Sequence, residues 1–186
     1  MVQTKSLTML KSLFIDSKKQ LAASIKHKKH PFRFFTFTTI ACDGSPHSRT
    51  VVLRAFDSET MTLSIFTDSR SNKVAELNHD PRAELLFYDS NQLLQLVLKV
   101  QLEEKVVSTK SYNNLPEQSK KDYTSIDQPG AYIKGPDQVH YDFESPHFTR
   151  LEFKILQLEY LKLKRPNHIR ALFQAKDNWK GKFISP

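Results

Sequence analysis

The chain has 186 residues, of which 39% are hydrophobic and 26% charged, a composition that excludes an intrinsically disordered protein. Its net charge of +8 is uneven, because residues 1–30 contain seven lysines and one acidic residue, Asp16, which leaves +2 for the remainder. A solvated lysine face on an N-terminal helix explains most of this charge, so nucleic-acid binding is the weaker interpretation. The length suits one domain over 1–186.

Two further classes are disfavoured. No segment approaches the roughly 20 apolar residues of a membrane-spanning helix. The first residues lack the apolar stretch and small-residue cleavage site of a secretory signal. The single cysteine, Cys42, cannot form an internal disulfide, which is typical of a reducing compartment. We therefore expect a cytoplasmic protein.

The N-terminal part of the chain is helical in pattern and then becomes β-rich. Apolar residues at near-helical spacing predict one or two amphipathic helices over 7–28, within a basic segment 1–29. Aromatic and β-branched residues then predict strands over 32–41 and 47–56, joined by a turn at 43–46. A third strand over 61–67 and a helix over 70–79 follow. That helix ends before Pro81.

The remaining pattern continues in short strands. We expect strands over 83–89 and 93–104, a helix over 108–122, a long segment over 123–148, and strands over 149–164, 168–175 and 180–185. Strands dominate and helices are peripheral, which predicts a mainly-β fold, an antiparallel β-barrel with peripheral helices. The 123–148 segment is either a cover over a site or a flexible connection.

Several kinds of chemistry lack their usual motifs. The chain has only four glycines and neither a Gly-rich dinucleotide turn nor a P-loop, so side chains and a helix end must hold any phosphate. His27 and His30 are flanked by lysines, which repel cations, and we expect no metal site.

The segment from Arg49 to Lys73 indicates an anion site. Arg70 and Lys73 fall at the predicted helix start, where cations are unfavourable unless a bound anion reverses the penalty. Arg49 and Arg54 lie on opposite faces of one predicted strand, because strand side chains alternate. Arg49 could bind a phosphate bidentately or form a surface ion pair, and the residue alone does not decide between these.

The order of motifs resembles the FMN-binding proteins related to pyridoxamine 5′-phosphate oxidase. The matching elements are RTVVLR at 49–54, FTDSRSNK at 66–73, Gln95, Tyr160, His168-Ile169-Arg170 and Trp179. Together they cover about 30–107 and 150–186. The resemblance implies a split β-barrel and a homodimer with FMN at the interface, both subunits contributing.

The resemblance also implies which residues bind FMN. Arg49, Thr67, Ser71 and Lys73 would meet the phosphate, the strand 50–54 would run along the flavin, and Gln95, Tyr160 and Arg170 would address its polar part. The full predicted set is Arg49, Thr50, Val51, Val52, Leu53, Arg54, Phe66, Thr67, Arg70, Ser71, Asn72, Lys73, Gln95, Tyr160 and Arg170. For Gln95 the alternative is an exposed strand residue, and for Tyr160 it is packing in the barrel wall. Trp179 is expected to pack at the core or rim.

Some positions depart from the oxidase pattern. Asn72 replaces an arginine, Tyr160 replaces a tryptophan, and Pro166 stands where an arginine would contact the vitamin substrate. Pro116 and Lys120 also stand where further substrate contacts are expected. The residues expected to bind FMN are present, whereas most of those expected to bind pyridoxamine phosphate are absent. The chain therefore resembles a branch of the family without the typical substrate contacts.

The sequence is compatible with three functions. The leading hypothesis is an FMN-dependent oxidoreductase of unassigned substrate, with His168 as the only nearby acid/base candidate. The second is a flavin-binding module without turnover, such as a redox sensor. The third is a nucleic-acid-binding barrel that stacks bases on Phe32, Phe34, Phe35 and Phe37.

Overall fold

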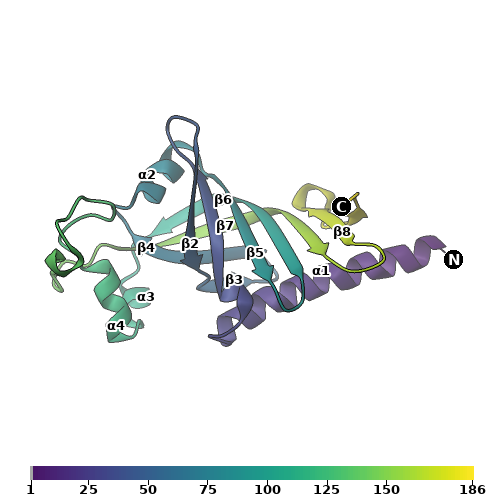
Figure 1. The fold of residues 1–186 in the computed structure, drawn as a ribbon, viewed down its shortest axis with the longest axis horizontal. Helices are drawn as coiled ribbons and strands as arrows, with labels where there is room; N and C mark the ends of the chain where they lie inside the picture. The colour runs from purple at the N-terminus through teal and green to yellow at the C-terminus, as the bar shows by residue number, and fades with distance from the viewer. Residues whose placement is uncertain (1) are drawn as a thin grey trace.

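A computed structural model describes residues 2–186, with side chains from Thr4 onward. Its framework is a nine-stranded antiparallel sheet with a few helices around it (Figure 1). The strands are β1 Phe34–Ile40, β2 Pro46–Val52, β3 Ala55–Asp57, β4 Thr62–Asp68, β5 Arg82–Asp89, β6 Leu94–Val106, β7 Phe148–Lys162, β8 Ile169–Gln174 and β9 Lys182–Phe183. The helices are α1 Val2–Lys26, α2 Asn72–His79, α3 Thr109–Asn113 and α4 Glu117–Lys120, and the predicted mainly-β barrel is confirmed.

The sheet order explains why the barrel is split. Strands follow the path β2-β1-β5-β6-β7-β4-β3, with β8 and β9 attached beside β7. One edge of β7 pairs with β6, whereas its other edge pairs with β4 over 148–154 and with β8 over 157–162. The two ends of the path meet because the chain passes from β2 into β3, where the N–H of Arg54 donates to the Ser64 carbonyl at 3.0 Å.

Alternation along the strands sets the inner and outer faces. In β5 the inner residues Ala83, Leu85 and Phe87 are buried, and the outer residues Leu86 and Tyr88 are exposed. Rings from three parts of the chain fill the interior, and the ring centres of Phe35 and Phe87 lie 4.5 Å apart. The inner face therefore carries the core, while the outer face of β5 keeps apolar side chains at the surface.

Helix α1 packs along one side of the barrel (Figure 1). Its buried face repeats at helical spacing through Leu10, Ser17, Leu21 and Ser24. The two serines are fully buried, and their hydroxyls donate to the carbonyls of Leu13 and Leu21 within the helix. The lysines lie on the remaining faces. None of the helices within residues 2–186 combines the length and apolar character needed to cross a bilayer.

Several boundaries differ from the expected ones. The predicted strand over 47–56 is two strands, because the chain bends at Leu53 and Arg54 to close the barrel. The predicted helix over 108–122 is two short helices followed by a 3-10 turn, since Pro116 interrupts the backbone hydrogen bonding. The segment 123–148 has one 3-10 turn at Pro136–Gln138 and an isolated bridge between Ser125 and Tyr141.

Candidate functional site

A compact group of hydroxyl and basic side chains forms where β4 meets α2. Thr67 is buried near the end of β4, and Ser71 is the residue directly before α2. The two hydroxyl oxygens are 3.1 Å apart, and Lys73 Nζ donates to Thr67 Oγ1 at 2.9 Å. We call Arg49, Thr67, Ser71 and Lys73 the basic cluster. Because α2 begins here, its free N–H groups add partial positive charge.

Burial and a neighbouring positive charge both disfavour the charged form of Lys73. Burial lowers the pKa of the Lys73 ammonium below its usual value of 10.5, and the nearby positive charge of Arg49 lowers it further. Asp68 and Glu76 oppose this shift only in part. A bound anion would relieve both effects. The chemistry of the group therefore fits a phosphate.

Arg49 joins the cluster from β2. It lies opposite Phe37, whose side chain is fully buried, so Arg49 points to the inner face of the sheet. Its guanidinium donates to Thr39 Oγ1 and to Glu76 Oε2, the latter at 2.9 Å. Glu76 also contacts His47, with Nδ1 and Oε1 2.6 Å apart. The sequence suggested Arg49 but not these partners.

The backbone of residues 50–52 lies on a free sheet edge beside this cluster, whereas the N–H groups of Leu53 and Arg54 donate to the carbonyls of Arg33 and Ser64. β2 is the first strand of the sheet path, and within residues 2–186 it has no strand partner on its other edge. An edge strand leaves half of its backbone N–H and C=O groups unpaired in the sheet. Thr50 is exposed, Val51 and Val52 are half-buried, and Leu53 is buried in the core. The predicted role of this segment therefore rests on its backbone.

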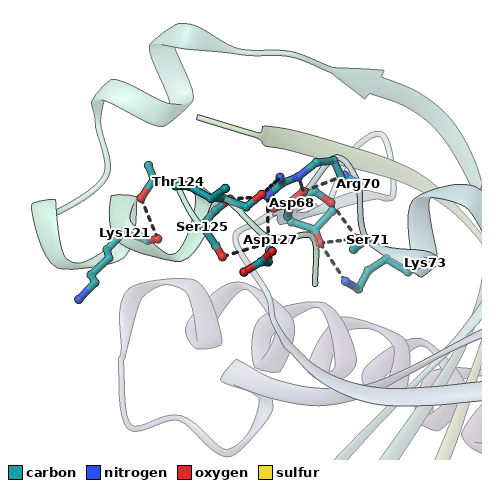
Figure 2. A network of polar contacts seen from close by, with 10 residues as sticks. Asp68, Arg70, Ser71, Lys73, Lys121, Thr124, Ser125 and Asp127 are labelled. Atoms are coloured by element: carbon teal, nitrogen blue, oxygen red, sulfur yellow. Dashed lines mark hydrogen bonds and ion pairs between the residues drawn. The ribbon is translucent and has the colours of Figure 1, made fainter. Parts of the chain in front are cut away.

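Arg70 has a different environment from the one expected. Its guanidinium pairs with Asp68 at 2.7 Å and donates to the carbonyls of Ser125 and Ile126 at 2.7 and 2.8 Å (Figure 2). It thus ties the 123–148 segment to the turn before α2. Asn72, the first residue of α2, is exposed. The structure gives Arg70 a role in holding the loop and does not place it in the basic cluster.

Phe66 and Arg54 lie under the same loop. The Arg54 guanidinium carbon is 5.4 Å from the centre of the Phe66 ring, and Phe66 packs at 5.0 Å against the ring of Phe148. These residues belong to a second apolar cluster with Leu115 and Tyr123. Burial raises the pKa of Tyr123, an effect that nearby Arg54 partly opposes. Phe66 therefore supports the site through packing.

Gln95 and Arg170 lie elsewhere, on the outer face of the sheet. Gln95 in β6 pairs with Leu161 in β7, which pairs with Arg170 in β8, so the three share one face in a row. Arg170 Nε donates to Glu159 Oε1 at 2.8 Å. We call Gln95 and Arg170 the polar row. Both side chains are half-buried.

The polar row is far from the basic cluster within one chain. Thr149 of β7 pairs with Thr67, and Leu161 of the same strand pairs with Arg170. At about 3.3 Å per residue, twelve residues of strand separate these two points by up to about 40 Å. Figure 1 likewise shows α2 and β8 towards opposite ends of the sheet. Within one chain the two groups therefore lie towards opposite ends of β7.

Tyr160 does not join either group. It is 5% exposed and packs in the main core, on the face of β7 opposite to Leu161. Burial raises its pKa to about 12, with a smaller contribution from Asp16 of α1. Tyr160 therefore packs in the barrel wall, which is the alternative to a cofactor contact. Trp179 stacks on Phe14 with ring centres 5.3 Å apart, as expected of a core or rim residue.

His168 is exposed in the turn between β7 and β8, where its Nδ1 accepts a hydrogen bond from the Lys164 N–H at 3.1 Å. It lies two residues from Arg170 and so belongs to the same end of the sheet as the polar row. No contact joins it to the basic cluster among the described residues.

Sequence reasoning missed Glu76, Asp68 and the loop contact of Arg70. A signal for Glu76 was present, because it follows Lys73 by three residues and therefore shares its helix face. The pairing of Arg70 with the backbone of Ser125 and Ile126 joins segments more than fifty residues apart. No local pattern could have indicated it.

Comparison with known proteins identifies the fold. Residues 16–103 match the family model described as "Pyridoxamine 5'-phosphate oxidase, FMN-binding domain". Pyridoxine/pyridoxamine 5'-phosphate oxidase 2 of Arabidopsis thaliana is 36% identical over 70 residues, which are 38% of this chain and 35% of that protein. The matched region thus spans about a third of this curated relative.

Two solved structures share the architecture over almost the whole chain. A pyridoxamine 5'-phosphate oxidase-related, FMN-binding protein from Nostoc punctiforme PCC 73102 superposes with a TM-score of 0.73 at 21% identity, covering 92% of this chain and 96% of that one. PhzG from Burkholderia lata 383, solved with tetrahydrophenazine-1-carboxylic acid, gives 0.72 at 17% identity, covering 91% and 90%. At these identities the likeness establishes the split-barrel fold alone.

Proposed function

Because residues 16–103 match the FMN-binding domain of pyridoxamine 5'-phosphate oxidase and the whole chain has the fold of its relatives, we propose that this protein binds FMN and acts as an FMN-dependent oxidoreductase. The observation that carries the proposal is the basic cluster. Two cations, two hydroxyls and a helix N-terminus meet there. Burial, and after it the charge of Arg49, lower the pKa of Lys73, and a bound anion would favour its charged form.

Each part of the chain then has a defined task. Arg49, Thr67, Ser71 and Lys73 would hold the phosphate of FMN, and the free edge of β2 would lie along the ring system through its backbone. When bound, FMN supplies hydride or single-electron transfer, which no amino-acid side chain provides. Gln95 and Arg170 would donate hydrogen bonds to the polar edge of the ring and stabilise negative charge there.

A homodimer would unite the two separated groups. The outer face between them exposes apolar side chains, with Phe34 58%, Leu86 36% and Tyr88 46% exposed. Tyr88 lies directly opposite Gln95, and Leu86 lies opposite Thr36, which pairs with Thr50 of β2. The apolar face therefore extends from the polar row to Thr50 of β2, the strand that carries Arg49 on its other face. A two-fold interface on it would place the polar row of one chain beside the basic cluster of the other.

A mixing experiment tests this arrangement. In a dimer with shared sites, a heterodimer of Arg49→Ala and Arg170→Ala chains contains one intact site and one doubly altered site. We expect the mixture, after unfolding and refolding together, to recover sites of wild-type FMN affinity at up to a quarter of the wild-type site number, because half of the dimers are mixed and each has one intact site. If both groups served one site within a single chain, mixing would restore none.

The cofactor itself is tested by spectroscopy. Fresh protein, or protein incubated with FMN and desalted, should show the absorbance bands of oxidised flavin, and released cofactor should have the mass of FMN. Protein that stays colourless and does not bind added FMN would contradict the proposal.

Turnover is a separate question from binding. His168 is exposed and already accepts a backbone hydrogen bond, which makes the non-catalytic flavin module the alternative to test. Photoreduced protein should reoxidise at rates that change with one of a panel of amines, aldehydes and quinones if it is an oxidoreductase. Rates that never change would favour the module. Nucleic-acid stacking has little support, because Phe32, Phe35 and Phe37 are buried and only Phe34 is exposed.

The cellular location stays a proposal as well. Cys42 is a free, exposed thiol, which suits a reducing compartment, and we infer the cytoplasm from it.

A further inference from the structure

Glu76 is a buried carboxylate at the centre of a network that the cofactor assignment does not use. It comes from the second turn of α2 and is 4% exposed. Its Oε1 lies 2.6 Å from His47 Nδ1, and its Oε2 accepts hydrogen bonds from Arg49 and from the hydroxyl of Thr39. One carboxylate therefore joins α2 to both β1 and β2.

The carboxylate is ionised despite its burial. Desolvation acts to raise the pKa of Glu76, but hydrogen bonds from Thr39, His47 and Arg49 and the charge of Arg49 outweigh it and lower the pKa below its usual value. A buried charge of this kind is stable only while its partners stay in place. The same partners are therefore held in fixed positions by Glu76.

The position of Arg49 follows from this network. A guanidinium has five N–H donors in a rigid plane. Two are used by Thr39 and Glu76, which fix that plane and leave other donors free. Lys73 is one helical turn before Glu76, so the carboxylate also lowers the mutual repulsion of the two cations. Without Glu76, Arg49 would be free to rotate away from Lys73.

We propose that Glu76 is a positioning residue for phosphate recognition, which orients the Arg49 guanidinium towards the space shared with Lys73. The proposal rests on the proposed binding of FMN at the basic cluster. A competing effect exists, since a carboxylate near the site also repels an anion. We expect orientation to outweigh this repulsion, because the charge of Glu76 is already paired with Arg49 and its second oxygen is hydrogen-bonded to His47.

The test compares FMN with riboflavin, which has the same ring system but no phosphate. The ratio of their dissociation constants measures phosphate recognition and is insensitive to general damage. Glu76→Gln keeps the side-chain shape but has one acceptor oxygen, so it cannot hold Thr39, His47 and Arg49 together. We expect this variant to lower the preference for FMN about 5- to 10-fold and to leave riboflavin binding within about twofold, by loss of charge-assisted hydrogen bonding.

Two further variants keep the test decisive. Thr39→Val removes a hydroxyl that touches both Arg49 and Glu76, and it should lower the FMN preference about two- to threefold even if Glu76→Gln does not fold. Asp89→Asn alters another buried carboxylate, which bonds to Asn91 and Gln92, and it should leave the ratio unchanged. It is the matched control.

The outcomes separate the two proposals. If the wild-type protein binds no FMN, the proposed function fails. If the wild type prefers FMN and Glu76→Gln keeps that ratio, raises it, or weakens both ligands equally, the positioning role of Glu76 is overturned.

Discussion

The basic cluster and the polar row are built in different ways. In the basic cluster, buried side chains bond to one another, and Thr67, Ser71 and Lys73 are already in contact without a ligand. In the polar row, Gln95 and Arg170 lie on a half-exposed sheet face beside uncovered apolar side chains. The first group is preorganised by contacts within one chain, whereas the second lies on an open sheet face. Substitutions in the two groups should therefore have different effects on the affinities for FMN and riboflavin.

The largest effect is expected at Arg49. Replacing Arg49 with Ala removes charge-assisted hydrogen bonds and leaves Glu76 buried without its main cation, so FMN affinity should fall by about 2–3 kcal/mol, about 30- to 150-fold. Riboflavin affinity should change much less. Titration calorimetry with both flavins measures the difference, and Arg49→Lys, which keeps the charge but loses the planar fork, should lie between. Equal losses for the two flavins would remove Arg49 from the phosphate site.

Substitution of Arg170 should lower flavin affinity less than substitution of Arg49, and it should affect FMN and riboflavin equally. Arg170→Ala removes a hydrogen-bond donor on the outer face, and we expect FMN and riboflavin affinities to fall together by about 1 kcal/mol, about fivefold. Because the donor would come from the other subunit, wild-type flavin binding should also weaken when the protein is diluted below its dimer dissociation constant. Binding independent of protein concentration in a protein shown to dissociate would contradict the shared site.

Lys73 provides a pH-dependent test of the basic cluster. Without a ligand its pKa is lowered, and a bound phosphate stabilises the charged form and raises the pKa. FMN affinity should therefore fall as pH rises through the lowered pKa, and binding near that pH should take up protons. Riboflavin should show neither effect. Measurements in buffers of different ionisation enthalpy detect the proton, and Lys73→Arg should flatten the profile.

The smallest effect is expected at Tyr160. Its hydroxyl is buried in the core near α1, so Tyr160→Phe should change flavin affinity by less than about twofold. A flavin titration of this variant, beside a melting curve to confirm folding, measures the change. A tenfold loss of flavin affinity with an unchanged melting temperature would indicate that Tyr160 contacts the flavin.

The sequence predicted most of the fold because local patterns carry it. Alternation in β5, the turn after Ile40 and the helix before Pro81 all depend on residues close in sequence. The basic cluster was also predictable, since Thr67, Ser71 and Lys73 lie within seven residues that form one strand-to-helix turn. Arg49 joins them through the β2 edge of the barrel.

The remainder depends on contacts that no local pattern contains. In β7, Leu156 is exposed and Leu158 and Tyr160 are buried, so both faces of the strand are apolar and alternation does not indicate which side is inside. The resemblance implies a cofactor role for Tyr160, whereas the folded barrel buries its side chain in the core. The position of Arg70 at a helix start predicts a phosphate contact, whereas its partners in the structure include the Ser125 and Ile126 carbonyls of a distant loop.

Strand β7 has a consequence for how this protein could change over time. It is one unbroken strand of 15 residues that borders the basic cluster near Thr149 and the polar row near Leu161. No side chain touches both groups within the chain as described, so a substitution in the polar row can alter the environment of the ring without moving the phosphate contacts. An insertion inside β7 would instead shift both groups at once. Under the proposed function, the contacts to the ring could diversify at one end of β7 while those to the phosphate are maintained at the other.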